Sequence, residues 1–320
     1  MIRQFIWTHH AHKTLQRISL LLADQTLTLI DVGAAGGIEP RWRQITNKLD
    51  YIGFEPDDRS NLEDLVRGQD YASYTLLPFA LWSENGLLKI NLCKKPGVSS
   101  HFLPDINFTQ KFPRSDRFNV VGEVDVKAVR LDSVDIKRCD FIKLDIQGGE
   151  LAVLQGAEKL LPRVFGLEIE VEFLHIYKAQ PLFGDICTFL AEHGLDFIDF
   201  TNLCRWNRQQ SRIFGQCVFG DALFLKSPER IKQYFDESKI TLSDVGRYNA
   251  ILALYRRADL MQRCLDLFGD LLNEDQKMIK DVNSAMTEIN KDLSKMRIVA
   301  RISRFLFRLI GNHTRSHITY

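Results

Sequence analysis

The chain has 320 residues, of which 45% are hydrophobic, and a formal net charge of +1 at pH 7. These values are typical of a globular protein with one large domain, or with one domain and an extension, and they give no overall attraction to nucleic acid. The six cysteines include no Cys-x-x-Cys pair, which argues against a zinc site and a disulfide framework and favours a reducing cytoplasm.

The first residues of the chain predict a helix that leads into the main domain. Apolar residues are spaced through residues 1–26, without the continuous apolar core and the small-residue cleavage site of a signal peptide. No apolar stretch of the sequence is long enough to span a bilayer. We therefore expect a cytoplasmic protein whose main domain begins at Leu27.

The predicted fold is organised around residues 27–37, with the sequence LTLIDVGAAGG. The apolar run predicts a buried parallel strand, and the Gly-Ala loop predicts a tight turn into a helix. We expect that helix to begin near Ile38, with Pro40 in its first turn. Glycines in the loop would let backbone N–H groups approach a ligand closely.

Acidic residues near the ends of the first two strands indicate what that ligand is. Residues 51–54 predict the second strand, and Glu55 lies about twenty residues past the turn, where doubly wound folds place a carboxylate on ribose hydroxyls. The dinucleotide pattern G-x-G-x-x-G does not fit, because Ala35 occupies its second glycine position. Asp31 suits the cationic amino-acid end of a cofactor better than a pyrophosphate. The sequence therefore predicts S-adenosylmethionine (SAM) as the cofactor.

The middle of the chain alternates strand and helix signals. Further strands are predicted at 71–77, 87–92, 124–129, 164–171, 197–200 and 222–225, and helices at 56–66, from 150 onward and at 183–193. The tripeptide at 84–86 predicts a hairpin turn, and prolines keep 93–118 irregular, as is typical of a lid or a binding wall. Together these elements predict a doubly wound, Rossmann-like α/β sheet.

The run DFIKLDI at 140–146 places charged side chains in a central strand. Ligands of open α/β sheets bind beyond the carboxyl ends of the strands, where Asp145 lies. Methyl transfer from SAM to a hydroxyl requires a base, and Asp145 is the predicted base. Lys143 would keep Asp145 ionised, or would take the proton itself if burial lowered its pKa. Alternatively, the two residues form an ion pair that only fixes the strand.

Other polar residues near this strand are weaker candidates. Glu168 and Glu170 would bind acceptor hydroxyls or Mg²⁺, although no metal site is predicted. His175 and Tyr177 follow in a loop typical of an acceptor wall, and His101 in the irregular segment is a further candidate base.

Beyond residue 228 the sequence has helical periodicity without a strand signal, so a boundary is predicted at 226–228. The chain is thus expected to have a lead-in helix at 1–26, a catalytic domain at 27–227 and a helical extension at 228–320. In residues 296–310, arginines and large apolar side chains fall on opposite faces of one helix. Such a helix either contacts an anionic membrane surface or packs on its own domain or across a homodimer.

Several blocks of the sequence, in this order, resemble the FkbM-type family of SAM-dependent methyltransferases, which methylate hydroxyl groups. The blocks are IDVGAAGG, YIGFEPD, PFALWSENG, VRLDS, DFIKLDIQGGELAVLQGA, LEIEVEFLHIYKAQPLF and FGDALFL. The resemblance covers residues 27–225, and the DFIKLDIQGGE block is its most specific part. Two positions depart from the family pattern: Gln147 replaces a common acid, and Phe79 replaces a common Asn.

The resemblance implies a role for individual residues. The methionine end of SAM would be lined by Asp31, Gly33, Ala34 and Gly37. Glu55, with Pro56 after it, would hold the ribose, and Ala80 and Leu81 would flank the adenine. Asp145 would also touch the cofactor. The predicted catalytic residues, Asp145, Lys143 and His175, rest on their positions in the sequence and not on the resemblance.

The sequence therefore predicts an O-methyltransferase that acts on a sugar, a glycan or a secondary metabolite, with no nucleic-acid partner. One alternative is a Rossmann-type NAD(P)-dependent oxidoreductase, which shares the strand-turn-helix and the acid after the second strand. The other is a non-catalytic scaffold that keeps the fold and recruits partners through the helical extension.

Overall fold

The computed structural model describes residues 18, 21–22, 24–57, 66–208, 215–272, 279–291 and 294. The chain divides into two compact units, one of residues 24–248 and the other of residues 1–23 with 249–320. Most of the predicted lead-in helix, most of the predicted helix at 56–66 and the amphipathic segment 296–310 lie outside the described residues. The domain boundaries predicted from the sequence stay predictions.

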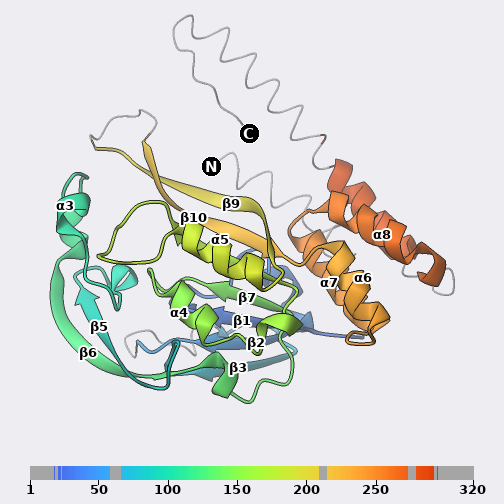
Figure 1. Ribbon diagram of the computed structural model, residues 1–320, viewed down its shortest axis with the longest axis horizontal. Coiled ribbons are helices and arrows are strands. Elements are labelled where there is room, and N and C mark those ends of the chain that lie inside the picture. The colour runs from blue at the N-terminus through green and yellow to red at the C-terminus, as the bar shows by residue number, and fades with distance from the viewer. Residues whose placement is uncertain are drawn as a thin grey trace, which may run out of the picture. The chain divides into compact units, whose positions relative to one another are not determined.

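The larger unit is built on a seven-stranded sheet in the order β3-β2-β1-β7-β8-β10-β9 (Figure 1). Its strands are β1 (Leu27–Val32), β2 (Leu49–Phe54), β3 (Ser73–Leu77), β7 (Phe141–Leu144), β8 (Gly166–Glu172), β9 (Asp196–Trp206) and β10 (Gln216–Leu225). All pairs are parallel except those that β10 makes with β8 and β9. The chain runs outward from β1 to β3 and then returns to place β7 on the other side of β1. This order confirms the predicted doubly wound fold, and its switch point lies between β1 and β7.

The core explains why these apolar runs form strands. All six residues of β1 are buried, as expected for a central strand that is covered on both faces. Helices α4 (Glu150–Gln155) and α5 (Phe183–Glu192) lie in front of the sheet in Figure 1. One apolar cluster joins Ile30 and Ile142 of the sheet to Leu154 and Leu190 of these helices.

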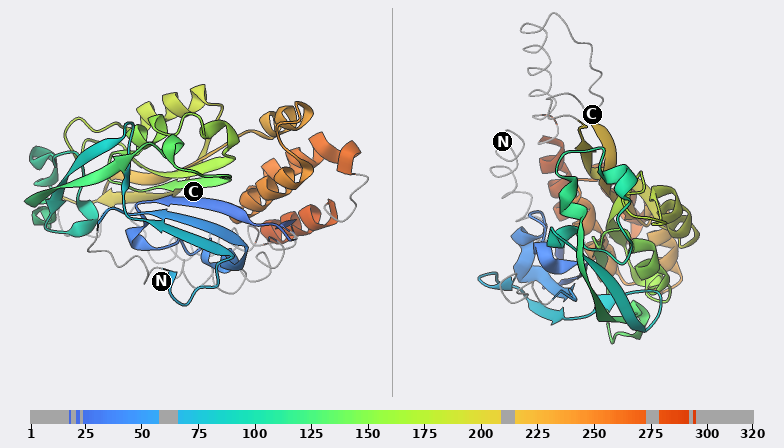
Figure 2. Two further views of the ribbon diagram at one scale, coloured as in Figure 1. Left: turned by 90° about the horizontal axis from the view of Figure 1, so that it is seen from below. Right: turned by 90° about the vertical axis from the view of Figure 1, so that its left-hand side faces the viewer.

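A second sheet of three strands, in the order β4-β6-β5, stands beside the first (Figure 2). Its strands are β4 (Ala80–Leu81), β5 (Gly86–Cys93) and β6 (Val120–Val129). The predicted hairpin turn at 84–86 is wrong, because β4 and β5 do not pair with each other. Ala128 of β6 is paired with Ala80 of β4 and with Gly86 of β5, so β6 lies between them. The turn was predicted from three neighbouring residues, whereas β5 pairs with β6, a strand from much later in the chain.

The helix predicted to begin near Ile38 is also wrong. The chain instead forms two short 3₁₀ helices, at Ala34–Gly36 and Arg43–Lys48. Gly37 leaves the first of them with a φ of 68° and a ψ of 173°, and Ile45 has non-helical dihedrals within the second. Continuous α-helix is therefore interrupted on both sides of Pro40. Helix α4, predicted from residue 150 onward, is likewise short, and Leu161 belongs to a later 3₁₀ helix at Leu161–Arg163.

The proline-containing segment 93–118 is irregular, as predicted. It contains only short helical pieces: Pro96–Val98, α3 (Ile106–Thr109) and Ser115–Phe118. Two isolated bridges hold it in place, from Ser100 to Asn91 of β5 and from Pro104 to Tyr177.

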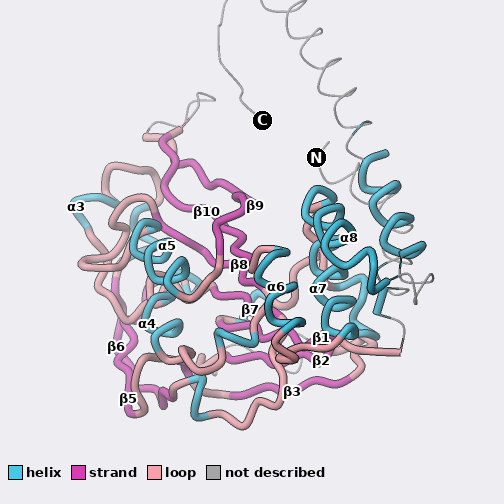
Figure 3. Tube along the Cα trace, turned by 45° about the vertical axis from the view of Figure 1, so that its right-hand side comes forward, coloured by secondary structure: helices cyan, strands magenta, loops and turns pink. Residues whose placement is uncertain are grey.

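Helices follow the last strand, as the periodicity predicts. They are α6 (Pro228–Asp236), α7 (Leu242–Leu254) and α8 (Ala258–Leu272), and residues 279–291 are also helical (Figure 3). Helix α6 begins with Pro228 and is capped by Ser227, whose Oγ accepts a hydrogen bond of 3.2 Å from the Arg230 N–H. Within the described part of the chain, none of the helices has the length and apolarity needed to cross a membrane.

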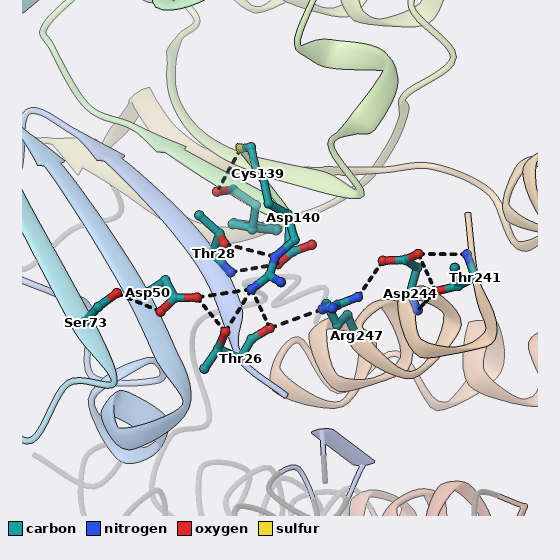
Figure 4. Close-up of polar contacts among 11 residues, drawn as sticks. Thr26, Thr28, Asp50, Ser73, Cys139, Asp140, Thr241, Asp244 and Arg247 are labelled. Atoms are coloured by element: carbon teal, nitrogen blue, oxygen red, sulfur yellow. Dashed lines mark hydrogen bonds and ion pairs between the residues drawn. The ribbon is translucent and has the colours of Figure 1, made fainter. Parts of the chain in front are cut away.

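Polar contacts tie together the amino ends of the parallel strands (Figure 4). Arg138 donates to the Thr26 carbonyl at 3.0 Å, to Asp50 at 3.1 Å and to Asp140 at 3.2 Å. Asp140 also accepts from the Thr28 N–H at 2.7 Å, and its burial raises its pKa to about 6 against the opposing effects of Thr28 and Arg138. These groups fix the amino edge of β1, β2 and β7, which leaves the carboxyl edge for a ligand.

Candidate functional site

A cavity of about 1010 Å³ opens at the carboxyl ends of β1, β2 and β7. This is where open α/β sheets bind their ligands. Of the residues predicted to bind the cofactor, the cavity is lined by Gly33, Glu55, Pro56, Ala80, Leu81 and Asp145. The other predicted residues, Asp31, Ala34 and Gly37, do not line it. The second sheet and segment 93–118 supply further walls, so this segment lines the cavity and its role as a binding wall stays a prediction.

The turn after β1 brings the backbone against the end of β7. Gly33 has a φ of 83°, a conformation that L-residues rarely adopt, and its N–H donates to the Phe54 carbonyl at 3.0 Å. A Cβ on Gly33 would lie only 2.0 Å from the backbone oxygen of Asp145. The glycine therefore lets the first loop and the end of β7 meet in one wall of the cavity.

We expect Gly33→Ala to lower the free energy of unfolding by about 2 kcal/mol and to weaken cofactor binding, because the new methyl group forces the loop away from Asp145 and strains the left-handed φ. Gly36→Ala is the matched control, since a Cβ there meets no atom within 4 Å and Gly36 has no positive φ. Urea unfolding of both variants checks this. Equal stability of the two variants would show that the loop is not constrained by β7.

Glu55 is held at the end of β2 by the loop itself. Its side chain accepts hydrogen bonds from the Ala35 N–H at 3.1 Å and from the Asp57 N–H at 2.8 Å. The residue is only 7% exposed, and burial raises the pKa of its carboxyl against the opposing effect of these two N–H groups. The contact with Ala35 fixes Glu55 relative to the glycine loop. The carboxylate and the N–H groups of the loop are therefore already positioned to bind a polar ligand.

Asp31 and Lys143 form a buried pair behind the cavity wall. Asp31 is 1% exposed, and its Oδ2 accepts a hydrogen bond of 2.9 Å from the hydroxyl of Tyr51. The Nζ of Lys143 lies 3.9 Å from Oδ1 of Asp31 and 3.6 Å from Oδ2 of Asp145. Burial raises the pKa of Asp31, whereas the Lys143 charge and the Tyr51 hydrogen bond lower it.

The charges around Lys143 bear on its predicted roles. Burial alone would lower its pKa, but the charges of Asp31, Asp145, Glu39 and Glu168 outweigh that effect and raise it. The raised pKa favours the protonated form of Lys143, so burial does not turn this residue into a base. Its Nζ lies near both aspartates, and whether this contact positions a base or only fixes the strand stays a prediction.

Gln147 connects the end of β7 to β8 and was not predicted as a site residue. Its Nε2 donates to Oδ1 of Asp145 at 3.1 Å and to Oε1 of Glu170 at 2.7 Å, while its Oε1 accepts from the Tyr177 hydroxyl at 3.0 Å. Its φ of 63° is uncommon for a residue with a side chain. Burial and the neighbouring Asp145 and Glu172 raise the pKa of Glu170. A neutral amide at 147 donates to two carboxyl groups, which an acid at this position could not do when ionised. The sequence did carry a signal for this residue, because Gln147 stands where the family commonly has an acid.

Two of the three glutamates of β8, Glu168 and Glu170, have different surroundings. Glu170 lines the cavity, whereas Glu168 does not line it and lies 3.2 Å from the Arg41 guanidinium, with a hydrogen bond from the Thr201 hydroxyl. Glu150 also does not line the cavity; it accepts from the Ile146 N–H at 2.8 Å, and burial raises its pKa to about 7. Among the described residues, no three His, Cys, Asp or Glu side chains are grouped so that they could hold a metal ion.

The two candidate histidines have different positions relative to the cavity. His101 lines the cavity, where its ring lies 4.8 Å from that of Trp82 and its Nδ1 lies 3.0 Å from the Lys89 carbonyl oxygen. His175 is exposed and does not line the cavity. Tyr177 is buried and reaches the site through Gln147.

Other cavity residues were not predicted as site residues. They include Trp82, which lies in the PFALWSENG block, and five residues outside any motif: Lys95, Arg117, Phe118, Lys127 and Trp206. The only signal of these five is their position in the irregular segment and in strands of otherwise ordinary composition.

Comparison with known proteins gives one family match, to the "Methyltransferase FkbM domain" over residues 31–197. Among solved structures, the methyltransferase FkbM from Methylobacillus flagellatus KT aligns at 13% identity and a TM-score of 0.37, covering 61% of this chain and 43% of that chain. The match thus spans less than half of the Methylobacillus protein. Precorrin-6y C5,15-methyltransferase from Geobacter metallireducens GS-15 aligns at 11% identity and a TM-score of 0.36, covering 67% and 87%. No curated protein sequence matches the chain.

Proposed function

From the premise that the chain belongs to the FkbM methyltransferase family, and is therefore a SAM-dependent methyltransferase, we propose that it methylates a hydroxyl group of a sugar, a glycan or a secondary metabolite. The observation that supports a hydroxyl acceptor is the position of the Asp145 carboxylate. It is partly exposed to the cavity at the carboxyl end of β7 and lies 3.6 Å from a protonated Lys143. Family membership does not support the oxidoreductase alternative.

The residues of the cavity fit SAM. Glu55 offers a carboxylate, fixed by two backbone N–H groups, to ribose hydroxyls. Pro56, Ala80 and Leu81 give an apolar wall for the adenine.

When bound, SAM supplies an electrophilic methyl group on a sulfonium. The chain's own contribution is to orient the acceptor and to remove its proton. Asp145 accepts the proton of the attacking hydroxyl, and Lys143 places a positive charge 3.6 Å from its Oδ2. Gln147 fixes the Asp145 carboxylate through its bond to Oδ1, which leaves Oδ2 for the hydroxyl. Aromatic and apolar cavity walls exclude water from the transfer.

The test has two steps. Titration calorimetry with S-adenosylhomocysteine (SAH) first establishes the cofactor site, and incubation with methyl-labelled SAM then screens sugars, glycans and hydroxylated metabolites as acceptors. We expect label that is stable to alkali, as in an ether, and is absent when the acceptor hydroxyl is blocked. Label on a carboxylate, which alkali removes as an ester, would overturn the hydroxyl acceptor. A folded protein that does not bind SAH would overturn the cofactor assignment.

A further inference from the structure

The part of the cavity wall built by segment 93–118 carries positive charge. Lys95 and Arg117 of this segment line the cavity, and Lys127 of β6 lines it nearby. The acidic lining residues, apart from Asp125 on β6, belong to or directly follow β2, β7 and β8: Glu55, Asp57, Asp145 and Glu170. The cavity therefore has an acidic side at the sheet and a basic side at the irregular segment.

Arg117 is the most constrained of the basic residues. Its guanidinium lies 4.6 Å from the centre of the Trp206 ring and 4.9 Å from the centre of the Phe118 ring. The centres of these rings are 5.8 Å apart, and Trp206 is the last residue of β9. Stacking on aromatic faces orients a guanidinium and leaves its N–H edge available for a planar, bidentate partner.

In the described part of the chain, no acid lies within ion-pair distance of this guanidinium. Among the described residues, Arg117 has no ion pair, and its Nε is buried without a hydrogen-bond partner. The adjacent acid, Asp116, lies 2.6 Å from Lys94 instead. Burial lowers the pKa of Arg117, which still remains charged at neutral pH. A half-buried cation that lacks a partner is costly unless a ligand supplies the missing acceptor.

Lys95 adds a second cation to the same place. Its backbone N–H donates to the Arg117 carbonyl at 3.1 Å, so the two residues lie side by side on neighbouring chain segments. The part of the chain that the structure describes holds no ion-pair partner for the Lys95 side chain.

Aromatic contacts connect this basic pair to the reacting side of the site. The Phe118 ring lies 6.2 Å from that of Tyr177, whose hydroxyl donates to Val98 and to Gln147, each at 3.0 Å. Gln147 in turn bonds Asp145. The basic side is thus connected to the predicted base through these side chains, whereas Glu55 follows β2, which lies on the other side of β1 from β7. A cavity of about 1010 Å³ is also at the upper end of the range for one small ligand, so it has room for an acceptor beside the cofactor.

We propose that Arg117, with Lys95, forms an anion subsite, and that the acceptor of this methyltransferase carries a carboxylate or a phosphate that docks there while its hydroxyl faces Asp145. This inference rests on the proposed function and specifies its substrate class. Within that class, acidic sugars carry a carboxylate and sugar phosphates a phosphoryl group, so both sources are included in the test.

The test measures binding to full-length protein saturated with SAH. D-glucuronate, D-glucose 6-phosphate and D-glucose are titrated separately, and tryptophan fluorescence follows binding because Trp206 contacts Arg117. We expect at least one anionic sugar to bind ten-fold or more tightly than glucose, with affinity that falls as salt rises. The sugar that binds more tightly identifies carboxylate or phosphate as the source.

Variants connect the effect to Arg117. Arg117→Met should remove the preference for the anion, and Arg117→Lys should retain part of it. Arg114→Met is the matched control, because Arg114 is exposed three positions earlier and does not line the cavity. SAH affinity, measured on every variant, reports folding and the cofactor site independently.

Each outcome decides the proposal. If wild-type protein binds SAH but shows no preference for either anion, or if Arg117→Met keeps the preference, the anion subsite is wrong and the methyltransferase assignment stands. If wild-type protein does not bind SAH, the proposed function itself fails. Loss of the preference in both Arg117→Met and Arg114→Met would assign it to the general charge of the surface and would also overturn the subsite.

Discussion

Asp145→Asn should lower the turnover of methyl transfer by at least about 100-fold while SAH affinity changes by less than about three-fold. An amide cannot accept the proton of the attacking hydroxyl, but it keeps the size of the carboxyl and one oxygen for the hydrogen bond from Gln147. Removal of the negative charge also leaves Lys143 paired with Asp31 alone, which the fold tolerates because Lys143 still lies 3.9 Å from that carboxylate. Single-turnover assays with labelled SAM measure the effect.

Asp125→Asn provides the control for this substitution. Asp125 also lines the cavity, but it lies on the exposed strand β6 and not at the end of β7. It should retain nearly full turnover. A fall in SAH affinity that matches the fall in turnover would assign Asp145 to cofactor binding. Unchanged turnover would show that Asp145 is not the base and that its contact with Lys143 is only structural.

Glu55→Ala should weaken the binding of SAM and SAH by about 100-fold, with turnover at saturating SAM changed far less. Charged hydrogen bonds contribute roughly 1.5–3 kcal/mol each, and the carboxylate is expected to accept two from the ribose. The substitution also leaves the N–H groups of Ala35 and Asp57 without their acceptor, which loosens the glycine loop. Titration calorimetry with SAH measures the affinity directly.

The conservative variant Glu55→Gln separates these two causes. Its amide oxygen can still accept from the backbone, but it offers a weaker acceptor to the ribose, so we expect an intermediate loss of affinity. Glu84→Ala removes an exposed acid that does not line the cavity and should have no effect. Equal SAH affinity in wild type and Glu55→Ala would mean that the ribose does not meet this residue, and the assignment of the adenosine end would have to be abandoned.

The comparison of wild type with these variants also bears on how the site is assembled. Gly33, Glu55 and Asp145 come from three different strand ends, yet each contacts the next through the first loop: Gly33 packs on the Asp145 backbone, and Ala35 binds the Glu55 side chain. A defect in the loop should therefore affect both cofactor binding and transfer, whereas Asp145→Asn should affect transfer alone. This difference in the affected step distinguishes the loop from the base.

The sequence by itself determined the central sheet and the general place of the site. An apolar run of strand length, such as β1, is buried on both faces, and its residues alone are enough to predict a strand. A glycine-rich stretch directly after such a run predicts a tight turn. The position of an acid directly after a parallel strand likewise places it at the carboxyl edge of the sheet. For these reasons Gly33, Glu55 and Asp145 were predicted from residues that lie within a few positions of a recognisable strand.

Only the tertiary structure decided the partners of the charged groups. Asp31 stands opposite Lys143 because β1 and β7 pair in that register, which places its side chain behind the cavity wall, 3.9 Å from Lys143. A different long-range pairing inserted β6 between β4 and β5, where a local turn signal had predicted a hairpin. Arg117 and Trp206 lie far apart in the sequence and outside any motif, and only the fold brings them together. Periodicity and turn chemistry are properties of neighbouring residues, whereas pKa values, ion pairs and cavity walls depend on residues that only folding brings together.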